Sequence, residues 1–204
     1  MMHFKKIFSL SVFVIYFLYC PLAIAKQSTH KIEILVNDKI ITNYDIAQHF
    51  AINSILENII VTKENGDFLY NKTVNELIDL KLQQIKIKDY NIKIEDSNRE
   101  YYEDYFFKTR QLDRNKVYEV IEKNDLDINI LKEKINISIA WEQLTTGLFL
   151  HTVSVSESEI SALLKSDKSL SAELAKRIMT NKQLQLKSDK YLRDLRAEAN
   201  IEKR

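Results

Sequence analysis

The fold begins in residues 31–46, which read KIEILVNDKIITNYDI. The β-branched and apolar residues within positions 31–36 predict a short strand, and residues 39–41 predict a returning strand. Between them, Asn37 and Asp38 supply turn chemistry. A two-stranded hairpin is only marginally stable alone, so we expect this hairpin to lie against helices.

The same stretch also predicts how the first helix starts. Thr42 precedes a helical pattern over residues 43–58, and its hydroxyl can accept a hydrogen bond from an orphan amide of the first turn. Asp45 lies three positions later, where its negative charge favours the positive end of the helix dipole. We therefore expect a variant of the capping box at Thr42 and Asp45.

The rest of the chain alternates apolar helical patterns with short polar breaks. With 2 glycines and 1 proline among 204 residues, the sequence is poor in tight turns, which favours a mostly α-helical fold. The expected helices cover residues 69–89, 96–111, 113–123, 127–151, 157–164 and 170–199.

Polar residues at the predicted helix starts support these boundaries. Asp96, Asp113 and Asp127 are expected N-caps, and residues 156–159 form a full capping box. The helix that starts after Asp127 is apolar on two faces, so we expect it to be the central helix of the core. Its two stripes are Leu131, Ile135 and Ile139 on one side, and Ile130, Ile137, Trp141, Leu144 and Leu148 on the other.

Residues 1–25 are typical of an export signal. Lys5 and Lys6 precede the apolar run 7–20, and residues 23–25 form a small-x-small cleavage site. We expect cleavage after residue 25 and a periplasmic mature protein. Two alternatives stay open: an uncleaved membrane anchor, because the apolar stretch approaches the length that spans a bilayer, and a lipoprotein attached through Cys20.

Cleavage would remove the only cysteine and would take the formal charge from +1 to −1. The mature chain could then form no intramolecular disulfide and no thiolate metal site. Its balanced charge gives no global basic field that would favour nucleic acid or an anionic membrane. We therefore expect no nucleic-acid partner and no stable membrane insertion once the signal is removed.

Several segments, in order, resemble the SurA-type N-terminal domain of periplasmic chaperones. They are residues 36–46 of the hairpin and first helix, residues 77–96 with their extended link, residues 153–160, and residues 177–199, which resemble the family's C-terminal helix. The resemblance implies a helical domain with a short N-terminal β-hairpin, on which a long C-terminal helix packs. It divides the mature chain into a chaperone domain, residues 26–164, and a linker with the C-terminal helix, residues 165–204.

The chain departs from that family between these two blocks. SurA-type proteins usually carry parvulin-like prolyl isomerase domains there, whereas only residues 164–170 lie between the blocks here. The resemblance therefore implies a holdase without isomerase activity, whose clients are unfolded outer-membrane proteins in the periplasm. The hypothesis that the protein is a prolyl isomerase is disfavoured, because this short segment cannot contain such a domain.

An aromatic run provides the candidate client-binding residues. Tyr101 and Tyr105 share one helix face, and Tyr102 and Phe106 lie about 100° around it. Exposed aromatic patches usually mark binding surfaces. The alternative is that these rings fill the core and only their hydroxyl groups reach water.

The sequence suggests no enzyme and no cofactor. His30, His49 and His151 lie far apart, and no spacing among them matches a metal site. We expect no catalytic residues, no metal ligands and no bound cofactor.

A non-catalytic adaptor or assembly protein is the alternative function, because the amphipathic helix 170–199 must bury its apolar stripe somewhere. The sequence leaves open whether this helix docks on its own chain or swaps between two copies to form a homodimer.

Overall fold

The computed structural model describes residues 30–204, so the predicted export segment lies outside the described residues. Within that range the chain is mostly α-helical, as the sequence predicts, with seven α-helices, one 3-10 turn and three strands. The elements are β1 (Ile32–Val36), β2 (Lys39–Thr42), α2 (Asn43–Leu56), α3 (Gly66–Asp89), α4 (Asp96–Thr109), α5 (Arg114–Lys123), α6 (Ile128–Phe149), η1 (Leu150–Thr152), α7 (Glu157–Ser166), α8 (Ala172–Glu198) and β3 (Ile201–Lys203).

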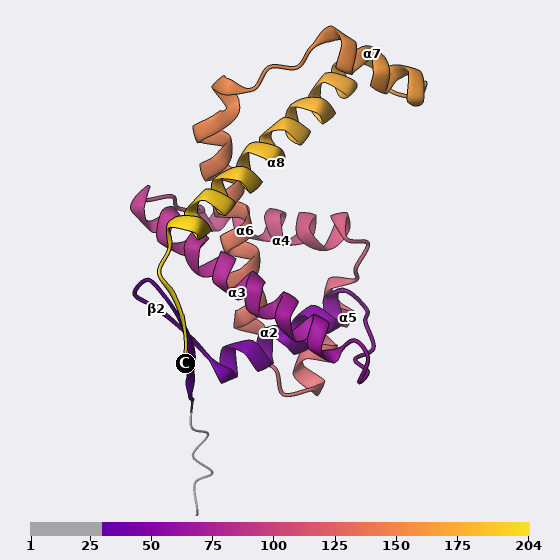
Figure 1. Cartoon of the computed structure of the whole chain (residues 1–204). Coiled ribbons are helices and arrows are strands. Elements are labelled where there is room, and N and C mark those ends of the chain that lie inside the picture. Colours follow the sequence, from indigo (N-terminus) through magenta and orange to yellow (C-terminus); the bar gives the residue numbers. More distant parts are fainter. Residues whose placement is uncertain (1–29) are drawn as a thin grey trace, which may run out of the picture.

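The strands form one antiparallel sheet in the order β2-β1-β3. β1 and β2 are the predicted hairpin, and its turn contains Asn37 at a φ of 53°, a left-handed conformation that Asn tolerates. The two-stranded hairpin was an incomplete prediction, because β3 pairs with β1 and places Val36 opposite Ile201. The C-terminus therefore lies beside the N-terminal hairpin (Figure 1).

Most of the predicted helix starts are confirmed. The Thr42 hydroxyl accepts from the Asp45 amide at 3.1 Å, and the Asp45 carboxylate accepts from the Thr42 amide at 2.8 Å. Asp113 and Asp127 cap α5 and α6, and residues 156–159 form the second capping box.

The expected N-cap at Asp96 is wrong. The cap position of α4 is Glu95, whose backbone is still extended and whose side chain makes no capping hydrogen bond. Two carboxylate residues are adjacent here, so the sequence cannot show which of them is the last extended residue, and the chain enters the helix one position earlier than expected.

Two hydrophobic clusters form the core. The first joins the sheet to α2 and α3 through Ile34, Val36, Ile41, Ile46, Val74, Leu77, Ile78 and Leu82. The second joins α2, α4, α5 and α6 through Ile52, Phe106, Phe107, Val117, Ile121, Leu131, Ile135 and Ile139. Helix α6 contacts α2, α3, α4, α5 and α8, which confirms it as the central helix. Of its predicted apolar residues, only Ile130 and Leu148 are partly exposed.

The C-terminal half of α8 docks on its own chain. Trp141 of α6 donates from Nε1 to Ser188 Oγ at 2.9 Å, and the ring of Tyr191 stacks on it with centroids 5.6 Å apart. Arg196 pairs with Asp79 of α3 at 2.6 Å. The other half of α8 packs with α7 as an arm that extends away from the sheet (Figure 1).

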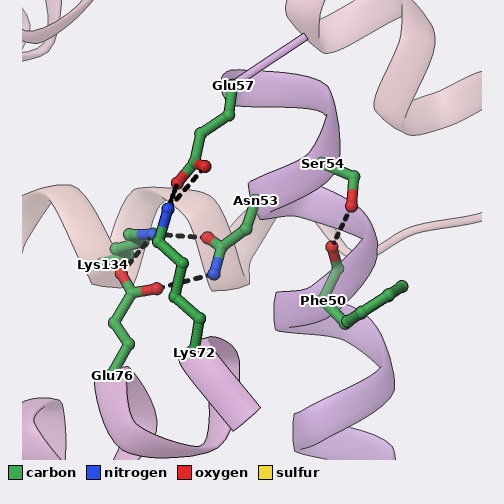
Figure 2. A network of polar contacts seen from close by, with 7 residues as sticks. All are labelled: Phe50, Asn53, Ser54, Glu57, Lys72, Glu76 and Lys134. Carbon is green, nitrogen blue, oxygen red and sulfur yellow. Dashed lines mark hydrogen bonds and ion pairs between the residues drawn. The ribbon is translucent and has the colours of Figure 1, made fainter. Parts of the chain in front are cut away.

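A closed polar network ties α2, α3 and α6 together (Figure 2). The Lys134 ammonium contacts Glu76 Oε1 and Asn53 Oδ1, each at 2.5 Å, and Asn53 Nδ2 donates to Glu76 Oε2 at 2.6 Å. At its edge, Lys72 pairs with Glu57 at 2.6 Å. The charges of Lys134 and Glu76 are paired within this triangle, so removing either side chain would leave the other charge uncompensated.

Removing residues 200–204 should lower the free energy of unfolding by about 2–4 kcal/mol, because the β1 hydrogen bonds to β3 and the packing of Ile201 are lost. Urea denaturation of residues 26–204 and 26–199 measures the difference. Lys203→Ala keeps the backbone pairing and is the control, with an expected change below about 0.5 kcal/mol. An unchanged midpoint for the shortened chain would show that β3 does not stabilise the fold.

Candidate functional site

Helix α4 divides its aromatic side chains between the core and the surface. Tyr101 and Tyr105 are 68% and 54% exposed, and they share one helix face as the sequence predicts. Tyr102 is half-buried, and its hydroxyl accepts a hydrogen bond from Gln143 of α6 at 3.3 Å. Of the four predicted client-binding residues, three therefore have side chains that solvent reaches.

Phe106 is the predicted residue that lies in the core. It is 5% exposed, packs edge-on against Phe107, and is covered by the guanidinium of Arg110, 3.7 Å from its ring centroid. Burial lowers the pKa of Arg110. The role of Phe106 is to fix α4 on α5 and α6, because its helix face points into the second cluster.

An open pocket of about 440 Å³ lies beside α4, between the end of α3, the extended link and α6. Its apolar floor is Ile87, Ile92, Ile94, Ile137 and Ala140, its basic rim is Lys88, Lys93 and Arg99, and Gln84, Asn91 and Asn136 complete it. We call these residues the basic-rimmed pocket.

The pocket adjoins Tyr102 where α4 meets α6. Arg99 and Tyr102 lie three residues apart on α4, and Ala140 and Gln143 lie three apart on α6, so both pairs follow the same junction between the two helices. The described lining residues carry cations and amides but no carboxylate, thiol or imidazole. Such a surface is suited to binding an apolar segment.

Sequence analysis missed this pocket because its residues come from four segments of the chain, and only the fold brings residues 84–99 next to residues 136–140. The one local hint was the extended link itself, where isoleucines 92 and 94 flank Lys93.

The histidines lie apart from this surface and from one another. His30 and His151 are exposed, whereas His49 is half-buried on α2. Among residues 30–204, no group of three His, Cys, Asp or Glu side chains is placed to hold a metal ion.

Burial lowers the pKa of His49 from 6.5 to about 4, and the positive charge of Lys134 adds to this effect. Within the described chain, His49 Nδ1 is buried without a hydrogen-bond partner, so no hydrogen bond at this atom favours the protonated form. The negative charges of Glu76 and Asp45 favour protonation, but they do not offset the effect of burial on the pKa.

In comparisons with known proteins, no protein-family model and no curated protein matches the chain. Within the described range, no helix combines the length and the hydropathy required to cross a bilayer.

His49 should make the protein less stable in acid. Its folded-state pKa lies below its unfolded value, so between pH 6.5 and about 4 the unfolded chain binds a proton that the folded chain does not, and stability falls as the pH falls. Between these two pH values, the free energy of unfolding measured with urea should fall by about 3 kcal/mol less in His49→Gln than in the wild type.

The exposed His151→Gln is the matched control and should follow the wild-type pH profile. Parallel profiles for the wild type and His49→Gln would contradict the role given to His49.

Proposed function

We propose that this protein is a periplasmic holdase chaperone, without isomerase activity, that binds unfolded outer-membrane proteins and keeps them from aggregating. The observation that carries the proposal is the exposure of Tyr101 and Tyr105 on α4, the helix that also borders the basic-rimmed pocket. A holdase binds unfolded chains reversibly through such apolar and aromatic surface, and it requires no catalytic group.

The way in which α4 packs on the core supports this role. Phe106 and Phe107 anchor its inner face, and Asp104 pairs with Arg114 of α5 at 2.7 Å. The exposed tyrosines therefore stand on a fixed helix. A rigid aromatic side chain loses little conformational entropy on binding, which favours contact with many different segments.

The resemblance to SurA-type N-terminal domains supplies the client class and the compartment. It covers the hairpin, the extended link and the C-terminal helix. In this structure the hairpin and the end of the C-terminal helix pack on the first hydrophobic cluster, and Ile94 of the link packs on the second. The periplasmic location depends in addition on the export signal expected in residues 1–25.

One observation favours the second candidate, an adaptor that acts through its C-terminal helix. Ile178 on the arm is exposed, as are Leu186 near the middle of α8 and Leu150 of η1. A discrete folded partner that is captured through the arm, together with no affinity for unfolded chains, would favour the adaptor.

Replacing Tyr101 and Tyr105 by Ser should raise the protein concentration needed for half-suppression of aggregation by about tenfold, because each aromatic contact contributes about 0.5–1.5 kcal/mol. Light scattering of a urea-diluted outer-membrane protein measures the effect.

The matched control is the pair Phe68→Ser and Tyr70→Ser on α3, whose side chains are 70% and 46% exposed. It removes a similar aromatic area from another part of the surface and should leave suppression unchanged. Equal losses in both variants would assign holding to general hydrophobicity, and inertness of the unmodified protein at molar excess would overturn the holdase.

A further inference from the structure

The basic-rimmed pocket combines an apolar floor with a cationic edge, and this combination has a definite chemical preference. We infer that it selects client segments in which an apolar side chain is flanked by carboxylates. The inference rests on the proposed holdase function, because it names the class of segment that the same surface holds.

The size and shape of the pocket fit a side chain of an extended peptide. Its volume of about 440 Å³ lies toward the lower end of the ~300–1,000 Å³ typical of ligand sites, and its mouth is open. The floor consists of four isoleucines and Ala140. Such a floor favours burial of an aliphatic or aromatic side chain and does not select one residue type.

The cations reach the rim from three different elements. Lys88 lies in the last turn of α3, Lys93 in the link and Arg99 in the first turn of α4. The positive charge of the edge comes from Lys88 and Lys93, because Arg99 already interacts with another group of the chain.

Among the described carboxylates nearby, Glu133 accepts a hydrogen bond from Gln84 and Asp89 pairs with Lys86. Asp38 is close enough to Lys88 for their charges to interact, but it does not line the pocket. The edge formed by the two lysines therefore complements a negatively charged segment.

The link also offers backbone for pairing. Residues 93 and 94 lie between α3 and α4 and belong to neither helix. An extended client segment that runs along them can place alternate side chains in the pocket and on the rim, as in β-strand addition.

Each exposed tyrosine of α4 directly follows a carboxylate residue. Glu100 is exposed directly before Tyr101, whereas Asp104, directly before Tyr105, is paired with Arg114 of α5. Like charges repel, so an acidic segment is disfavoured beside Glu100 and favoured at the lysines of the pocket.

The test uses two labelled peptides with the same isoleucine and phenylalanine residues, one alternating them with glutamate and the other with lysine. Fluorescence anisotropy with the mature protein should give at least tenfold tighter binding of the glutamate peptide at low salt. The difference should shrink at high salt, because exposed charges are screened. Equal affinity for both peptides would overturn the inference.

Charge reversal provides the second arm. Lys88→Glu with Lys93→Glu should weaken binding of the glutamate peptide at least tenfold and strengthen binding of the lysine peptide. Lys116→Glu with Lys168→Glu makes the same change in net charge at exposed sites outside the pocket and should leave the preference intact. Circular dichroism checks that both variants are folded, and an equal loss in both would overturn the inference.

Aggregation assays separate the two proposals. Intact suppression by the wild type, with no preference between the peptides, overturns the pocket assignment alone. Absence of any suppression overturns the holdase and, with it, the client class inferred here.

Discussion

The antiparallel pairing of β3 with β1 is the interaction on which the rest of the structure depends. It fixes the last residues of the chain beside the first described strand, with the Arg204 amide donating to the Glu33 carbonyl at 2.8 Å and the Asn37 amide to the Asn200 carbonyl at 2.8 Å. Because β3 follows α8 directly, this pairing fixes the end of that helix beside the sheet, and the contacts of Ser188 with Trp141 and of Arg196 with Asp79 hold its final turns on the core.

The position of α8 in turn leaves α4 accessible. Its C-terminal half covers Trp141 of α6 and reaches Asp79 of α3, whereas α4 packs at another side of α6. Figure 1 shows α4 extending to one side of the body, with the α7–α8 arm above it. The helix that carries the exposed tyrosines and borders the pocket is therefore held on its inner face only.

Features that depend on neighbouring residues were predictable. The hairpin, the caps at Thr42, Asp113 and Asp127 and the central helix follow from local hydrogen-bonding groups and apolar spacing. β3 was missed because three residues carry almost no periodic pattern and gain stability only from a partner about 170 positions away. Spacing placed Tyr105 and Phe106 on different faces, but only packing shows which face is inward. The basic-rimmed pocket needed the same long-range information.

Hydrogen exchange of the mature protein with and without an unfolded outer-membrane protein tests the central claim most directly. The account predicts slower exchange in the link and in α4 when the client is bound. The exchange rates in α8 and β3 should not change, because these elements pack on the core and do not contact the client. Protection confined to α7 and the first half of α8, or no protection anywhere, would contradict it.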